Sequence, residues 1–273
     1  MISRIGVLSE NFRQLRGDPQ IHPDASIVVP INAQADVDNF LLLLTDIAAY
    51  RGKRSFEVVL IVNNYPPEVP PPAIDAFRNA GLKVISIPDL RQPGIEVHIT
   101  ARIHGLHAAA TENAILFDAD CRIPNATALL DWYVEQFQAG AQLAYTHVGY
   151  YDLRPGRSVR VRIWFHHLSR WFKRAVLGVP TSRGSNYGVK RAALLQLYEQ
   201  RMLVSDMSVG PNIKAKGGRI AYSGAKDLIV LTSGRKIEGG WGHLIWYLGY
   251  RLGYNLRVLP VRPNAARYTK KRW

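Results

Sequence analysis

The chain has 273 residues, of which 47% are hydrophobic and 21% are charged, which is the composition of an ordinary globular protein with a sizeable core. Its single cysteine, Cys121, excludes a framework of internal disulfides and fits a reducing compartment. No stretch approaches the roughly 18 apolar residues of a membrane-spanning helix. We therefore expect a cytoplasmic protein that is at most peripheral to the inner face of a membrane.

The net charge of +14 comes entirely from the second half of the chain. Residues 1–150 contain 11 Lys and Arg against 16 Asp and Glu, whereas residues 151–273 contain 24 against 5. This asymmetry indicates a negatively charged partner, which could be a polyanion, an anionic membrane surface or a phosphate-bearing substrate. A solvated basic face is the alternative interpretation.

Strands and helices are predicted to alternate along the first 120 residues. Short β-branched runs such as SIVVPI, residues 26–31, are typical of parallel strands buried on both faces. The Pro-rich stretch 65–74 cannot continue a strand or a helix and is expected to form a surface loop. The strands are expected at 25–31, 56–64, 82–88 and 114–120, with helices at 36–52, 73–81 and 99–112.

This alternation predicts an α/β fold with an open, mostly parallel sheet, in which ligands bind beyond the carboxyl ends of the strands. Asp118 and Asp120, in the stretch ILFDADCRIP, lie just past the fourth predicted strand. Carboxylates without partners are costly to hold beside a buried strand. Two of them separated by one residue can turn toward one hard cation, which also coordinates phosphates. D-x-D alone is a weak motif, but its position here favours a metal site.

In their order along the chain, these segments resemble glycosyltransferase family 2, whose catalytic domain has the GT-A fold, over about residues 25–235. The matching segments are SIVVPINAQADVDNFLLLLTDI, FEVVLIVNN, TARIHGLHAA, ILFDADCRIP, RGSNYGVKRAAL and VSDMSVGPNIKAKGGRIAYS. The resemblance implies a Rossmann-like, mostly parallel central sheet flanked by helices. It also implies an N-terminal extension at 1–24, a catalytic domain at 25–235 with a donor half at 25–124 and an acceptor half at 125–235, and a basic aromatic C-terminal segment at 236–273.

The function that the resemblance implies is metal-dependent transfer of a hexose from a nucleotide-diphosphate sugar to a hydroxyl acceptor, lipid-linked or polysaccharide. Inversion at the anomeric carbon is expected, with Asp206 as the base. Mg or Mn would be held by Asp118 and Asp120, with His243 as a further ligand. The implied donor-binding residues are Pro30, Asn32, Asn63, Asn64, Arg102, Asp118, Ala119, Arg235 and Lys236. The implied acceptor-side residues are Gly184, Ser185, Asn186 and Ser205.

The chain departs from the family pattern at two places. Asn63 and Asn64 stand where an Asp usually contacts the nucleobase or ribose, and Ser205 stands where an acidic residue usually precedes the base. Two of the implied residues also have plainer interpretations. Asp206 could cap the helix that follows it, and Arg102 could brace Asp118 instead of binding the pyrophosphate.

Residues 232–243, TSGRKIEGGWGH, combine four glycines with Arg235 and Lys236. A flexible basic loop of this kind can close over a diphosphate and exclude water. The alternative is a simple linker to the C-terminal segment.

Two segments bear on the acceptor and on membranes. Residues 160–176 are predicted to form a basic, aromatic, amphipathic helix of the kind that lies at a membrane surface. From Arg251 onward the chain has seven basic residues and no acidic one, which also favours an anionic surface. An apolar stripe that packs into the core is the alternative for the first segment. One face of the helix predicted at 160–176 would present Trp164, Leu168, Trp171 and Phe172. Arg170, Lys173 and Arg174 would lie elsewhere on the same helix.

Three other classes of function remain open. The basic second half, with its interleaved aromatic residues, could bind nucleic acid, although no recognition module is present and no nucleic-acid partner is expected. A nucleotidyltransferase would also use metal held by carboxylates, but the first strand is not followed by a Gly-rich loop with a lysine. A non-catalytic relative of the same fold is suggested by Asn63, Asn64 and Ser205.

Overall fold

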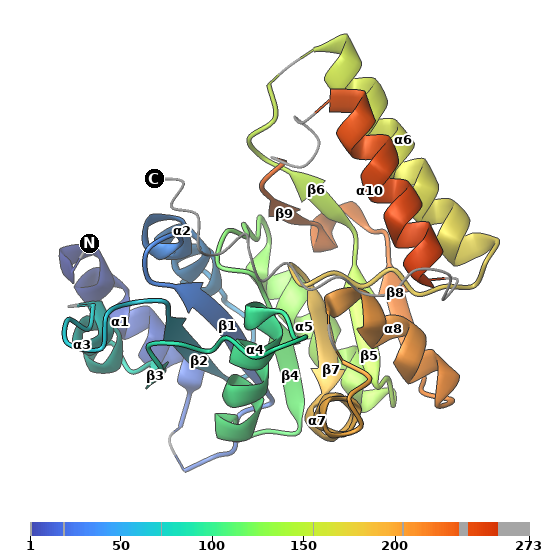
Figure 1. Ribbon diagram of the computed structural model, residues 1–273. Coiled ribbons are helices and arrows are strands. Elements are labelled where there is room, and N and C mark those ends of the chain that lie inside the picture. The colour runs from blue at the N-terminus through green and yellow to red at the C-terminus, as the bar shows by residue number, and fades with distance from the viewer. Residues whose placement is uncertain are drawn as a thin grey trace.

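The computed structural model describes residues 2–18, 20–71, 73–154, 156–203, 205–234 and 240–255. Its centre is a seven-stranded sheet with the strand order β3-β2-β1-β4-β7-β5-β8 (Figure 1). All neighbouring strands are parallel except for β7, which runs antiparallel to β4 and to β5. The expected α/β fold with a mostly parallel sheet is confirmed.

The first half of the chain alternates helices and strands, as its hydrophobic pattern predicts. Its elements are α1 (Ile2–Arg16), β1 (Ala25–Asn32), α2 (Val37–Ala48), β2 (Phe56–Asn63), α3 (Ala73–Asn79), β3 (Lys83–Ser86), α4 (Val97–Ala108), β4 (Asn113–Leu116) and α5 (Ala126–Gln138). All eight residues of β2 are buried, as expected for a strand covered on both faces.

The second half completes the sheet and adds a short parallel pair formed by β6 and β9. Its elements are β5 (Leu143–Thr146), β6 (Val148–Tyr150), α6 (Arg157–Ala175), β7 (Tyr187–Lys190), α7 (Arg191–Glu199), α8 (Asp206–Ala215), β8 (Ile220–Ser223), the 3-10 helix η1 (Lys226–Leu228), β9 (Val230–Thr232) and α10 (Gly240–Asn255).

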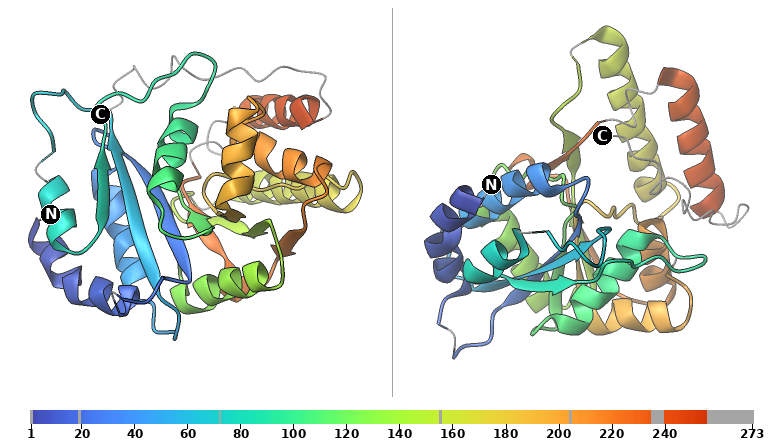
Figure 2. Two further views of the ribbon diagram at one scale, coloured as in Figure 1. Left: turned by 90° about the horizontal axis from the view of Figure 1, so that it is seen from below. Right: turned by 60° about the vertical axis from the view of Figure 1, so that its left-hand side comes forward.

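The sheet lies between two layers of helices (Figure 2). Alternate residues of β1 point to opposite faces: Ile27 and Val29 belong to one apolar cluster, and Val28 belongs to the other. Helices α1, α2, α3 and α5 cover the first face, and α4, α7 and α8 cover the second. Phe12 and Leu15 of α1 are buried in the first cluster, so residues 2–16 pack as part of the same core.

The topology brings the chain segments of interest to one edge of the sheet. The carboxyl ends of β1, β2 and β4 meet there because these strands are parallel neighbours. Because β7 is antiparallel to β4, with Tyr187 opposite Leu116, the amino end of β7 lies at the same edge. Residues 117–120 and 183–186 are therefore placed side by side.

Helices α6 and α10 contact each other and extend away from the sheet at one end of the molecule (Figures 1 and 2). Among the described helices, none combines the length and the apolar character that crossing a membrane requires.

Candidate active site

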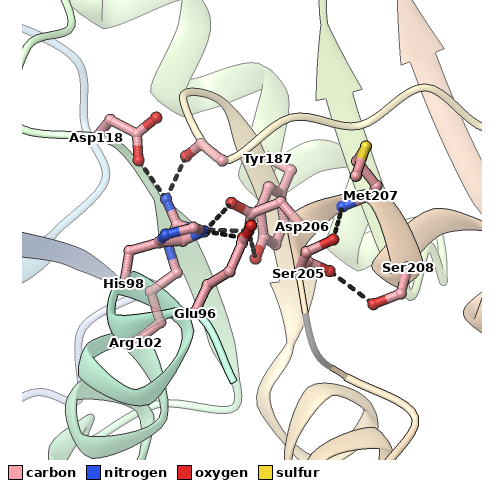
Figure 3. A network of polar contacts seen from close by, with 10 residues as sticks. Glu96, His98, Arg102, Asp118, Tyr187, Ser205, Asp206, Met207 and Ser208 are labelled. Atoms are coloured by element: carbon pink, nitrogen blue, oxygen red, sulfur yellow. Dashed lines mark hydrogen bonds and ion pairs between the residues drawn. The ribbon is translucent and has the colours of Figure 1, made fainter. Parts of the chain in front are cut away.

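Arg102 lies at the centre of the site and joins three segments of the chain (Figure 3). It is an interior residue of α4, and its side chain is only 1% exposed. Its Nη2 donates to Asp118 Oδ1 at 2.5 Å and to the carbonyl oxygen of Gly184 at 2.7 Å, and its Nη1 donates to Asp206 Oδ1. The guanidinium therefore braces Asp118, and it links this carboxylate to Asp206.

Asp206 is the first residue of α8, and its side chain is 14% exposed. Besides Arg102, the hydroxyl of Tyr187 donates to its Oδ1 at 3.1 Å, and Nε2 of His98 lies 2.9 Å from its Oδ2. His98 Nε2 also lies 3.1 Å from Glu96 Oε2. Asp206 is thus held by groups from α4 and β7 as well as by its own helix.

These contacts fix the charges at neutral pH. Burial by itself would raise the pKa of Asp206, but the positive charges of Arg102 and His98 outweigh it and hold that pKa well below its usual range. Burial would lower the pKa of His98, but Asp206 and Glu96 raise it to about 9. The two side chains are therefore a carboxylate and an imidazolium near pH 7.

Ser205 is the N-cap residue of α8. Its side-chain oxygen accepts a hydrogen bond from the backbone N–H of Met207 at 3.3 Å, and its carbonyl oxygen accepts one from the hydroxyl of Ser208 at 2.6 Å. The interpretation of Asp206 as the helix cap is therefore wrong, because the preceding residue, Ser205, caps the helix. The carboxylate of Asp206 is left to face the site.

Asp118 and Asp120 lie in the turn after β4, where the backbone N–H of Cys121 donates to the carbonyl oxygen of Asp118 at 3.1 Å. The Asp118 side chain is 38% exposed, and Asp120, which is partly exposed, accepts a hydrogen bond from Thr232 Oγ1 at 3.4 Å. Two partly exposed carboxylates at this edge are hard oxygen donors of the kind that Mg or Mn binds.

Within the ranges that the structure describes, no three or more His, Cys, Asp and Glu side chains are grouped as ligands for one metal ion. The side chain of His243, the further ligand that the resemblance implies, lies outside the description. Asp118 and Asp120 provide two carboxylates, so a cation held there would take its other ligands from a bound diphosphate and water.

The turn that carries these carboxylates is anchored on both sides. Arg122 forms a two-pronged pair with Asp46 of α2, with Nε to Oδ2 at 2.7 Å and Nη2 to Oδ1 at 3.0 Å. The backbones of Arg122 and Leu231 exchange two hydrogen bonds of 2.8 Å and 2.9 Å. The chain that leads into residues 235–239 is therefore tied next to the D-x-D turn.

The donor-half residues lie at the ends of β1 and β2. The Asn64 side chain donates to Asn32 Oδ1 at 2.9 Å, and Asn64 has a φ of 62°, which an asparagine tolerates better than most residues. Asn63 is buried and donates to the carbonyl oxygen of Ile31 at 3.0 Å. Pro30 is buried inside β1, and Ala119 is buried between the two carboxylates. Arg235 and Lys236 lie outside the described residues.

The acceptor-side residues precede β7. A β-carbon at Gly184 would lie 2.2 Å from Asp206 Oδ2 and 2.8 Å from Arg102 Nη2, so any other residue would have to displace these two side chains. The carbonyl oxygen of Ser185 accepts from Cys121 Sγ at 3.1 Å. Asn186 is buried, accepts from the hydroxyl of Tyr133 and donates to Thr146 Oγ1 at 2.5 Å. Asn186 therefore fixes the segment, while Gly184 lets Arg102 and Asp206 meet.

Sequence reasoning missed Glu96, His98 and Tyr187. The helix was predicted to begin at residue 99, one position after His98. The observed α4 begins at Val97, which places His98 four residues before Arg102 on the same face. Tyr187 directly follows the G-S-N segment. Nothing local in the sequence indicates that either residue reaches Asp206, which is 108 positions from His98.

Comparison with known proteins bears on the fold. No protein-family model matches the chain, and no curated protein matches its sequence. Among solved structures, glucosyl-3-phosphoglycerate synthase from Mycobacterium tuberculosis, in complex with Mn2+, UDP-glucose and phosphoglyceric acid, has a TM-score of 0.51 and 17% identity, over 98% of this chain and 90% of that chain.

Two further structures are similar. The mannosyltransferase PcManGT from Pyrobaculum calidifontis, in complex with GDP-Man and Mn2+, has a TM-score of 0.59 and 14% identity, over 96% of this chain and 74% of that chain. TarS from S. aureus, in complex with UDP-GlcNAc, has a TM-score of 0.51 and 15% identity, over 88% of this chain and 68% of that chain. At such identities the likeness concerns architecture: the chain has the GT-A fold of these nucleotide-sugar glycosyltransferases.

Proposed function

We propose that this protein transfers a sugar from a nucleotide-diphosphate sugar to a hydroxyl acceptor. The observation that carries the proposal is the bridge through Arg102, which joins a carboxylate at the end of β4 to a carboxylate at the start of α8. The first lies beside the ends of β1 and β2, where α/β sheets bind ligands. The second carboxylate, that of Asp206, is partly buried and is bordered by residues that precede β7. The fold similarity supports the same reaction class.

On the donor side, Asp118 and Asp120 would hold Mg or Mn. When bound, such a cation neutralises the charge that develops on a pyrophosphate leaving group. Arg102 keeps Asp118 in a fixed orientation, because three of its contacts are made to different elements. Asn64 and Asn32 offer neutral amide groups at the expected nucleoside position, so recognition there would use hydrogen bonds without a carboxylate.

On the acceptor side, Asp206 is the base that we propose. Its low pKa makes it a weak proton acceptor in the free protein. An acceptor hydroxyl becomes strongly acidic only as its oxygen bonds to the anomeric carbon, so a weak carboxylate base can take the proton late in the reaction. Attack from the face opposite the leaving group would invert the anomeric carbon. Hexose specificity and a lipid-linked or polysaccharide acceptor belong to this proposal as well.

The test is a screen of UDP- and GDP-sugars for hydrolysis and for nucleotide-diphosphate binding, with and without Mn. We expect affinity to fall on chelation and in Asp120→Asn, and hydrolysis to be lost in Asp120→Ala. Asp75→Ala is the matched control, because Asp75 is 81% exposed and pairs with Arg78 of its own helix, α3.

Four results would count against the proposal. Equal nucleotide affinity with and without metal would reject the metal site. Nucleic-acid binding with a steep salt dependence and no donor binding would favour a nucleic-acid-binding protein. Formation of a nucleotide sugar from a nucleoside triphosphate and a sugar phosphate would indicate a nucleotidyltransferase, and donor binding without any turnover would indicate a non-catalytic relative.

A further inference from the structure

Helix α6 exposes its apolar face and buries its polar face. Trp164 is 61% exposed and Trp171 is 54% exposed. The other large exposed side chains of α6 lie at the same helical spacing and form one stripe with them. The exposed stripe consists of Val161, Trp164, Phe165, Leu168, Trp171 and Phe172. This arrangement is the reverse of that of an ordinary surface helix, which turns its apolar face toward the core.

The buried face of α6 is occupied by Arg162, His166, Arg170 and Lys173. Arg170 Nη2 donates to the carbonyl oxygen of Thr181 at 3.0 Å, and Nε2 of His166 contacts Nη2 of Arg183. These contacts fix the rotation of the helix. Arg170 and Lys173, which the sequence pattern placed away from the aromatic face, therefore point into the protein, and the aromatic groups point out.

Helix α10 continues the apolar surface. Three large apolar side chains of this helix are exposed, Trp241, Ile245 and Trp246, the last of them by 60%. The rings of Phe165 and Trp241 meet edge to face with their centroids 6.3 Å apart, so the exposed stripes of the two helices are joined. The two helices lie side by side at the end of the molecule away from the sheet (Figures 1 and 2). A joined apolar surface of this extent on a protein is typical of an interaction site.

We propose that this aromatic face of α6 and α10 binds the surface of an anionic membrane. Charge complementarity selects this partner. Arg157 and Arg160 are exposed at the start of α6, and the sequence contains no acidic residue between Asp152 and Glu199. A second copy of this chain would bring the same arginines to the interface and no acidic residue from this segment to pair with them. A negatively charged lipid surface offers apolar depth for the rings and attraction for the arginines.

The geometry suits a helix pair that lies in the membrane plane. Tryptophan rings prefer the boundary between headgroups and acyl chains, and α6, with 19 residues, offers a stripe about 28 Å long. Neither helix is long and apolar enough to cross the membrane. The proposal depends on this surface alone, so a test of membrane binding does not depend on whether the protein transfers sugars.

The test is flotation of the full-length protein with vesicles of phosphatidylcholine, with and without phosphatidylglycerol. We expect flotation with the anionic vesicles at low salt, and a large loss at about 0.5 M salt, where the Debye length is under 5 Å. Trp164→Ser/Trp171→Ser should reduce binding by at least tenfold, because buried apolar area determines the strength of such binding. Ile21→Ser/Val69→Ser, which also removes two exposed apolar side chains, is the control and should bind normally.

A second variant keeps the test decisive if the tryptophan variant fails to fold, which circular dichroism would reveal. Arg157→Gln/Arg160→Gln leaves the apolar face intact and should weaken binding to anionic vesicles by roughly tenfold to thirtyfold. The proposal is overturned if the intact protein ignores anionic vesicles at low salt, or if both variants bind like the control. It is also overturned if ultracentrifugation shows a dimer that Trp164→Ser/Trp171→Ser dissociates, because a second copy would then occupy the face.

Discussion

Arg102 matters at the residue scale because it is the positive partner of two carboxylates that come from distant parts of the chain. Its removal would leave Asp118 and Asp206 without their shared cation. Asp206 in particular is largely buried, and among the residues that the structure describes it would keep His98 as its one charged partner. The effect of substitution should therefore exceed that of breaking a surface ion pair.

We expect Arg102→Met to lower the free energy of unfolding by about 3 kcal/mol or more, as when one partner of a buried ion pair is removed. Arg91→Met is the control, since Arg91 and its partner Asp89 are largely exposed, and it should cost under about 1 kcal/mol. Urea denaturation measures both. Equal losses in the two variants would show that the bridge contributes no more than a surface pair.

The His98–Asp206 pair should make stability depend on pH. The pKa of His98 rises from 6.5 to about 9 on folding. Because the pKa is higher in the folded state, protonation of His98 stabilises the folded protein. This contribution is complete below pH 6.5 and is lost as the pH rises through 9. It amounts to at most about 3 kcal/mol. Unfolding free energies measured at pH 6 and pH 9.5 should fall more steeply for the natural protein than for His98→Gln, and parallel curves would contradict this.

Asp206→Asn tests the proposed base directly. The substitution keeps the size of the side chain and removes its ability to take a proton. Turnover should fall by about a hundredfold or more while donor affinity stays unchanged. Asp227→Asn, at an exposed position, is the control. Unchanged turnover would leave Asp206 as a structural partner of Arg102 and His98.

At the scale of elements, local patterns predicted what depends on local chemistry. The β-branched runs gave β1 and β2 to within one residue of their observed ends, and the acidic pair was placed just past β4. Helical spacing also grouped the aromatic residues of α6 on one side. Spacing alone cannot tell which side of a helix is buried, because that depends on partners such as Thr181 and Arg183.

The site itself was predictable only in part. Asp118 and Asp206 were identified one by one, but they lie 88 positions apart, and only the antiparallel insertion of β7 brings them to one guanidinium. The sequence shows no such pairing in advance. The alternative interpretation, in which Asp206 caps α8, was likewise one position too late. Ser and Asp are both good caps, and only the backbone geometry distinguishes them.

The cap of α8 gives a prediction for this helix. Ser205→Ala removes the oxygen that accepts from Met207 and should lower the free energy of unfolding by about 1 kcal/mol. Ser205→Gly should cost only a few tenths of a kcal/mol from the loss of the cap, because glycine is a fair N-cap residue. Denaturation curves of the two variants would contradict this if they coincided.

At the scale of the whole molecule, charge is segregated along the chain, with the basic excess after residue 150. Deleting residues 257–273 removes six basic residues and no acidic one. We expect the shortened protein to bind anionic vesicles more weakly and with a shallower dependence on salt. Flotation over a salt series measures both quantities. Unchanged binding would show that α6 and α10 account for the attraction to anionic vesicles without residues 257–273.

The single reversed strand also has a consequence for how the protein is made. Strand β7 lies between β4 and β5, yet its residues are synthesised after both. Until about residue 190 has left the ribosome, β4 presents an unpaired edge and β5 has no neighbour on that side. Unpaired edges recruit strands from other chains. The nascent chain is therefore most prone to aggregation after β4 and β5 have been synthesised and before β7 has been. A chain truncated before β7 would keep these unpaired edges permanently.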